Sequence, residues 1–145
     1  MFSKACQYGI RSVIYIWKQS LSGLRVGAKE IAEHVQAPEP FTAKILQDLV
    51  RKNIVSSQKG PSGGFYVEEE QGKFSLKDLV VAIDGDELFT GCSLGLKYCS
   101  ESNPCPMHSD IVRIRVQLEE MLTRKTLKEI AQEVENGDSV LARFA

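Results

Sequence analysis

The amino-acid sequence predicts a mainly α-helical protein with one small β-hairpin. Apolar residues recur at helical spacing in several segments, beginning with 6–17. A Gly-rich stretch, GPSGG at 60–64, separates two short runs that suit β-strands. The chain has 145 residues, which is enough for one ordinary domain with its own core and an accessory element.

Three helices are expected in the first third of the chain. The segment 6–17 has a continuous apolar face, 22–27 is expected to be a loop, and AKEIAEHV at 28–35 has the pattern of a second helix. Pro40 suits the first position of a third helix that runs to about Lys52, because the missing N–H group would be unpaired there in any case.

The third helix is expected to have an apolar side and a basic, polar side. At the helical period, Phe41, Ile45, Leu46, Leu49 and Val50 fall on the apolar side. The opposite side carries Ala43, Lys44, Gln47 and Arg51.

A β-hairpin is expected next, with strands at 54–58 and 65–68. Gly60, Gly63 and Gly64 permit positive φ in the turn, and Pro61 fixes a turn corner.

Two capping-box patterns predict helices in the second half. Ser75 to Asp78 opens a helix that Gly85 ends, and Thr126 to Glu129 opens the last helix. Between them, a helix over 109–125 with Ser109 as its N-cap has apolar residues at positions 111, 114, 118 and 121. Such a seam outside the core usually packs against a partner.

Charge is unevenly distributed along the chain. Residues 1–67 carry nine Lys or Arg against four Asp or Glu, a balance of +5, whereas residues 68–145 carry nine against fifteen, a balance of −6. The basic half favours a polyanionic partner such as nucleic acid. The longest apolar run, 13–17, is far shorter than a membrane span, and the N-terminus lacks a signal-peptide cleavage site. We expect a cytoplasmic protein that does not contact a membrane.

The order of helix, turn, basic-faced helix and Gly-rich hairpin is typical of a winged helix-turn-helix, whose third helix enters the major groove of double-stranded DNA. Lys and Arg suit phosphates and guanine edges, and Gln suits adenine. Exposed N–H groups in the hairpin can contact phosphate. The alternative is the solvated face that any three-helix domain has. The candidate DNA-binding residues are Thr42, Ala43, Lys44, Gln47, Arg51, Lys59, Ser62, Gly63 and Gly64.

The segment GCSLGLKYCSESNPCPMH, 91–108, suggests a metal site. Its spacing is Cys92-x6-Cys99-x5-Cys105-x2-His108. A disulfide framework is not expected in a cytosolic chain. Zinc accepts a Cys3His set, although no Cys-x2-Cys pair is present, and iron-sulfur clusters tolerate wider gaps and a histidine ligand. The spacing leaves both open. Cys6, on the inward face of the first helix, is expected to be a core residue.

Three strings, YGIRSVIYI, VGAKEIAEHVQAPEPFTAKILQDL and LVRKNIVSSQKGPSGGFYV, resemble the iron-sulfur cluster regulators, bacterial dimeric winged-helix transcription factors of the IscR and NsrR type. The resemblance covers residues 2 to about 135. It implies a homodimer in which the long helix after the cysteines crosses to its twin, and a [2Fe-2S] cluster held by Cys92, Cys99, Cys105 and His108. The alternatives are [4Fe-4S] and zinc. The first cysteine gap is one residue longer than in the cluster-assembly regulators, and Gln7 stands where the nitric-oxide sensors have an acidic ligand.

We therefore expect a dimeric DNA-binding transcriptional regulator, with no enzymatic activity and no small-molecule substrate. The expected parts are a DNA-binding domain at 1–85, a cluster-binding loop at 86–108, and dimerisation and C-terminal helices at 109–145. One alternative keeps this fold but senses zinc or thiol oxidation without a cluster. A small redox carrier is disfavoured because the chain has no Cys-x-x-Cys pair.

Overall fold

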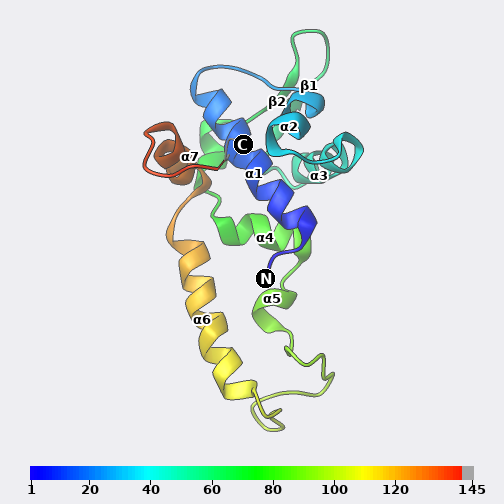
Figure 1. The fold of residues 1–145 in the computed structure, drawn as a ribbon, viewed down its shortest axis with the longest axis vertical. Helices are drawn as coiled ribbons and strands as arrows, with labels where there is room; N and C mark the ends of the chain where they lie inside the picture. The colour runs from blue at the N-terminus through cyan, green and yellow to red at the C-terminus, as the bar shows by residue number, and fades with distance from the viewer. Residues whose placement is uncertain (142–145) are drawn as a thin grey trace.

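The computed structural model describes residues 1–141 and is mainly helical, with one two-stranded antiparallel hairpin, as predicted (Figure 1). Residues 142–145 of the expected C-terminal segment lie outside the described residues. No helix within residues 1–141 is both long and apolar enough to span a membrane. The elements are α1 (Lys4–Leu21), α2 (Ala28–Val35), α3 (Glu39–Arg51), β1 (Ser56–Gln58), β2 (Gly64–Tyr66), the 3-10 helix η1 (Glu69–Lys73), α4 (Leu76–Asp84), α5 (Glu87–Thr90), α6 (His108–Arg124) and α7 (Leu127–Glu135).

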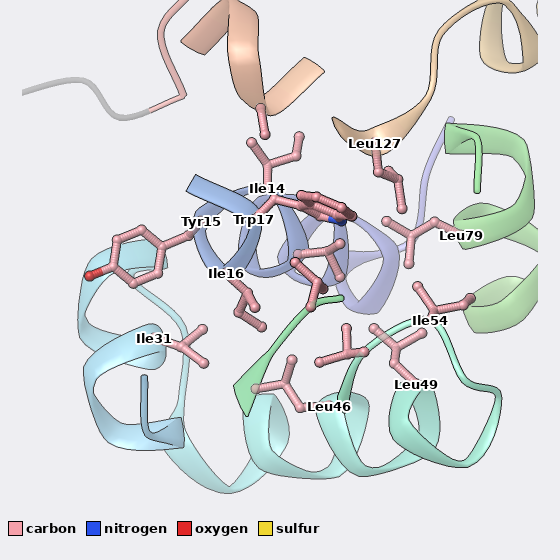
Figure 2. Packing of buried hydrophobic residues seen from close by; sticks show 14 of the residues in the cluster. Ile14, Tyr15, Ile16, Trp17, Ile31, Leu46, Leu49, Ile54, Leu79 and Leu127 are labelled. Carbon is pink, nitrogen blue, oxygen red and sulfur yellow. The ribbon is translucent and has the colours of Figure 1, made fainter. Parts of the chain in front are cut away.

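Helix α1 is the centre of the main core and contacts α2, α3, α4 and α7. It begins where the Ser3 hydroxyl accepts a hydrogen bond from the N–H of Cys6, at 3.0 Å. Figure 2 shows Ile14 and Trp17 of α1 between Leu127 on one side and the side chains of the helix-turn-helix on the other. Because apolar side chains from all four neighbours converge on α1, it holds α2, α3, α4 and the C-terminal helix α7 in one body.

The helix-turn-helix follows the predicted boundaries closely. Helix α2 covers 28–35 as expected and ends where Gln36 takes a left-handed conformation, φ 56°. Helix α3 begins at Glu39, one residue before the predicted start, and Pro40 lies in its first turn. The spacing of Phe41 predicts an inward-facing side chain, and that prediction is wrong: the residue is 40% exposed and packs edge-on against the ring of Tyr8.

The hairpin, or wing, pairs Ser57 with Phe65 and is shorter than the two predicted strands. The loop after α1 pairs with strand β2 of the hairpin through two backbone hydrogen bonds between Val26 and Phe65, of 3.0 and 2.7 Å. Gly64 is required at this crossing, because a Cβ atom there would lie 2.8 Å from the carbonyl oxygen of Val26, and φ is +143°.

Both predicted capping boxes are present. The hydroxyls of Ser75 and Thr126 accept hydrogen bonds from the N–H groups of Asp78 and Glu129, and the carboxylates bond back to the cap residues. The N-cap prediction for α6 is wrong: the helix begins at His108 and not after Ser109. The turn formed by the N–H of His108 and the carbonyl of Cys105, at 3.1 Å, leads directly into the helix.

Helix α6 stands away from the main core (Figure 1). Within its described residues, 108–124, only Leu122 is buried; it forms a second small core with Cys6 of α1 and Val80 of α4, and Phe89 of α5 packs against this cluster. Along the longest axis the wing and the cysteine loop lie at opposite ends of the molecule. The second core therefore joins α5 and α6, which flank the cysteine loop, to α1 and α4, which contact α3.

Candidate metal centre and nucleic-acid interface

The outer face of α3 presents three of the predicted DNA-contacting side chains. Lys44, Gln47 and Arg51 are exposed, and Arg51 forms an ion pair with Asp48 on the same helix. Ala43 is partly exposed. The side chain of Thr42 is buried, with 1% exposed, and its hydroxyl donates a hydrogen bond to the carbonyl of Pro38 at 3.0 Å. The structure does not present Thr42 on the outer face of α3, because its polar group is used inside the helix-turn-helix.

The wing presents Lys59 and Ser62 at its exposed tip, with Gly63 and Gly64 partly exposed beside them. One predicted donor is already used: the N–H of Gly63 bonds to the carbonyl of Gly60 at 3.0 Å and closes the turn. A Cβ atom on Gly63 would lie 2.1 Å from the carbonyl oxygen of Gln58. The role of Gly63 is therefore to form the turn, which leaves Lys59, Ser62 and Gly64 as the wing's candidate contacts.

Arg25 is a basic residue near the wing that the sequence reasoning missed. Its guanidinium carbon lies 4.7 Å from the centre of the Tyr66 ring, and the residue is exposed. The pairing of Val26 with Phe65 brings it there from the loop after α1. Its charge alone could have marked it as a candidate, but its position beside β2 depends on a pairing between residues far apart in the sequence.

The three loop cysteines converge in space. Their sulfur atoms all lie within 4.8 Å of one another, and each residue is partly exposed. Cys92 lies two residues after α5, and Cys105 lies three residues before α6. A turn closed by the N–H of Gly95 on the carbonyl of Cys92, at 2.9 Å, brings the chain back after the first cysteine. Sulfur is the donor that zinc and iron-sulfur clusters prefer, so this arrangement can hold either.

His108 contacts only one side of this sulfur group. Its Nδ1 lies 3.3 Å from Sγ of Cys99, whose sulfur also accepts the N–H of Cys105 at 3.4 Å. Nε2 is buried and has no hydrogen-bond partner within residues 1–141. Within residues 1–141, the three cysteine sulfurs form a compact group in which every pair lies within 4.8 Å. His108 is not a member of this group.

The pKa of Cys92 in the loop and the pKa of Cys6 in the core are shifted in opposite directions. Hydrogen bonds from the backbone of Leu96 and Leu94 lower the pKa of Cys92 to about 7, which favours the thiolate that binds metal. Burial, and to a smaller extent the nearby carboxylate of Asp84, raises the pKa of Cys6 to about 12. Cys6 is fully buried, which confirms that it is a core residue.

The winged helix-turn-helix fold and the basic outer face of α3 define a DNA-binding transcriptional regulator, here with a cluster of cysteines in the loop before a long exposed helix. The Rrf2 family, described as "Iron-dependent Transcriptional regulator", matches residues 2–133. The chain belongs to this family, which confirms the resemblance noted from the sequence and makes it a regulator and not an enzyme.

Relatives and solved structures agree with this assignment. A chain of Aquifex aeolicus (strain VF5), described as an HTH-type transcriptional regulator, is 29% identical over 133 residues, which are 90% of each chain. The regulator NsrR of Oceanobacillus iheyensis is 24% identical over 140 residues, covering 96% of this chain and 92% of that one.

Two solved structures share the fold. CymR, the global cysteine regulator of B. subtilis, has a TM-score of 0.74 at 20% identity, covering 91% of this chain and 96% of that one. T. potens IscR has a TM-score of 0.73 at 20% identity, covering 98% and 93%.

Proposed function

We propose that this chain is a homodimeric regulator whose affinity for DNA is set by a [2Fe-2S] cluster bound by Cys92, Cys99, Cys105 and His108. The observation that carries the proposal is the convergence of three sulfur atoms within 4.8 Å at the foot of α6. The match to a family described as iron-dependent supports iron as the metal. A promoter-binding role supports a cytoplasmic location.

The proposed DNA contacts come from the outer face of α3 and from the wing. Lys44, Gln47 and Arg51 enter the major groove, with Ala43 close to the base edges. Lys59 and Ser62 contact the backbone from the tip of the wing. Arg25, held beside Tyr66, adds a positive charge at the base of the wing.

Dimerisation through α6 is supported by its exposed apolar residues. Ile114 and Met121, one heptad apart, are 54% and 48% exposed, and Ile111 and Leu118 of the same seam are partly exposed. Two such helices would cover one another across a two-fold axis. We propose that this seam forms the centre of the dimer interface.

The position of His108 favours a two-iron cluster over a single zinc ion. On one tetrahedral zinc, three thiolates would lie about 3.8 Å apart and each about 3.6 Å from the histidine nitrogen. His108 stays outside the compact sulfur group while it contacts Cys99. Cys92 pairs with Cys105 at 3.9 Å and Cys99 pairs with His108 at 3.3 Å, which would give two donors to each of two irons and so supports a binuclear site.

A bound cluster would supply iron that responds to oxidants and to the supply of iron and sulfide. The chain's own residues would convert that state into a change at the DNA. Cys92 follows α5 and Cys105 precedes α6, so holding both sulfurs fixes α5 against α6. Leu122 and Val80 connect α6 to α4, which contacts α3. We propose that this link between α5 and α6 sets the distance between the two α3 helices of the dimer. That distance must match the spacing of the DNA half-sites.

The test begins with the selection of a DNA sequence that the protein binds from a random pool. The protein is then titrated anaerobically into this DNA, labelled with a fluorophore, and the dissociation constant is measured. We expect cluster-loaded and cluster-free protein to differ at least about tenfold in dissociation constant, and Cys99→Ala to behave as cluster-free. Ser93→Ala, a small exposed change in the same loop, is the matched control and should behave as wild type. Equal affinities of the cluster-loaded and cluster-free protein would refute control of DNA binding by the cluster. The proposed DNA-binding role would still hold if both states bind DNA.

A further inference from the structure

Two of the loop cysteines, Cys92 and Cys105, are in direct sulfur–sulfur contact, whereas the sulfur of the third, Cys99, is engaged by a histidine and a backbone N–H. Sγ of Cys92 lies 3.9 Å from Sγ of Cys105. We infer that, when the loop holds no metal, peroxide converts Cys92 and Cys105 into a disulfide and leaves Cys99 as a free thiol. This inference concerns the metal-free chain, so it does not depend on which metal or cluster the loop binds.

The contacts of Cys99 explain the choice of pair. Its sulfur accepts the N–H of Cys105 at 3.4 Å and lies 3.3 Å from Nδ1 of His108. The histidine belongs to α6, so this contact holds the Cys99 side chain to a fixed helix. Although the Cys99 sulfur also lies within 4.8 Å of the other two sulfurs, a disulfide at Cys99 would compete with both of these interactions.

The polar neighbours of the Cys92 sulfur do not hold it in the same way. The backbone of Leu94 and Leu96 lies close enough to this sulfur to lower its pKa. Both residues belong to the same tight stretch of loop as Cys92 and can move with it. The Cys92 sulfur, by contrast with that of Cys99, already contacts the Cys105 sulfur.

The backbone around the pair allows the remaining approach. A disulfide has an S–S length of about 2.05 Å, so the sulfurs must close by roughly 2 Å. Pro104 and Pro106 restrict the backbone on both sides of Cys105. Cys92 lies between Gly91 and a turn that contains Gly95 at φ +71°, and these glycines allow its side of the loop to move.

The reaction balances with a peroxide as the oxidant. One thiolate of the pair attacks hydrogen peroxide; an S–O bond forms, the O–O bond breaks, and the released hydroxide takes a proton to leave as water. The second sulfur then attacks the first; the S–S bond forms, the S–O bond breaks, and a second water leaves. Two thiols and one hydrogen peroxide give one disulfide and two waters. Because all three cysteines are partly exposed, a small oxidant can reach them.

The disulfide would have two consequences for the loop. It would tie α5 to α6 without a metal, because its ends lie two residues after α5 and three before α6. It would also remove two of the three sulfur donors, so the oxidised loop would not accept a metal until a thiol reductant opened the bond. We infer that the pair makes loading of the metal site dependent on the thiol redox state.

The test uses full-length protein made metal-free with a chelator under anaerobic conditions and then treated with one equivalent of hydrogen peroxide. Non-reducing proteolysis and mass spectrometry identify the bridged peptides. Wild type, Cys99→Ser and the control Ser93→Ala should form the 92–105 bridge in most chains, whereas Cys92→Ser and Cys105→Ser should not. A dominant bridge that includes Cys99, loss of the bridge in Cys99→Ser, or three free thiols after excess peroxide would each overturn the inference.

A second readout is the uptake of Zn²⁺ as a probe of the site. Peroxide-treated wild type should lose at least about tenfold in affinity for Zn²⁺ and recover it after reduction with dithiothreitol. Unchanged Zn²⁺ affinity in chains that carry the bridge would contradict the proposed block on loading. Neither assay requires an iron-sulfur cluster, so failure here and failure of the proposed function are distinguished.

Discussion

Truncation of one exposed isoleucine, Ile114→Ala on α6, should weaken the dimer without unfolding the protomer. Ile114 lies on the apolar seam and is 54% exposed, so its outer half has nothing to pack against within residues 1–141. Full burial of an isoleucine side chain contributes about 1.5–3 kcal/mol. The exposed half would therefore contribute about 0.8–1.6 kcal/mol when a partner covers it.

The symmetry of the dimer doubles this figure. In a two-fold interface the substitution removes the same packing from both copies, which gives about 1.6–3.2 kcal/mol per dimer. The dissociation constant of the dimer should then rise roughly 15- to 200-fold. Because the side chain is half exposed in the protomer, thermal stability measured where the chain is monomeric should change much less.

Sedimentation equilibrium over a range of concentrations measures this constant, and circular dichroism verifies the fold. Val116→Ala is the matched control: Val116 is 49% exposed on the same helix but lies about 160° around it from Ile114. Val116→Ala should leave the dimer unchanged. An Ile114→Ala dimer as tight as wild type, or an equal effect of Val116→Ala, would refute the assignment of the seam.

Three further predictions concern DNA binding, the core and a helix cap. Lys44 is exposed, and Lys44→Gln should make the slope of log K against log salt concentration shallower by about 0.9 if each Lys44 neutralises one phosphate, or by about 1.8 for the two copies in a dimer. Fluorescence anisotropy titrations measure this slope, and an unchanged slope would show that Lys44 does not contact phosphate. Leu46→Ala should cost about 2–5 kcal/mol of unfolding free energy in urea titrations, because Leu46 is fully buried, whereas a decrease below about 1 kcal/mol would contradict the packing of α3. Hydrogen bonds from the backbone N–H and then the hydroxyl of Thr126 lower the pKa of Glu129 below its ordinary value of 4.5, so Glu129 stabilises the fold above that value and this contribution is lost as pH falls below it. Glu129→Gln should therefore flatten the fall in Tm below about pH 4.5, and a parallel Tm curve for both proteins would contradict the cap.

The helices were predictable because their signals are local. The second helix at 28–35 and the capping boxes at Ser75 and Thr126 depend on residues within a few positions of each other. The same holds for the Gly-rich turn of the wing. Local patterns cannot specify which helical face meets a neighbour, and Phe41 shows this: its spacing predicts an inward position, but it packs on Tyr8 at the surface.

Features that depend on distant residues were not predictable in this way. The two bonds between Val26 and Phe65 extend the wing and bring Arg25 beside Tyr66, although about forty residues separate the partners. The short helix α5 has only four residues, too few for a helical period to appear. Both features become visible only when the packed structure brings distant segments together.

The cysteine site was partly predictable. Residue type and spacing identified the three thiols as metal-binding candidates, but spacing alone left zinc and iron-sulfur clusters open. The structure adds that the three sulfurs lie within 4.8 Å of one another, that Cys92 contacts Cys105, and that His108 contacts Cys99. Those relations depend on the fold of the loop between α5 and α6, in which no period is present.

The most direct test of iron-sulfur control is the content of iron and acid-labile sulfide in protein purified without oxygen. A [2Fe-2S] cluster predicts about two iron and two sulfide per chain, with Cys92→Ala, Cys99→Ala and Cys105→Ala each losing both. Protein that contains zinc in place of iron, or that contains neither iron nor sulfide, would contradict the proposal that an iron-sulfur cluster controls this regulator.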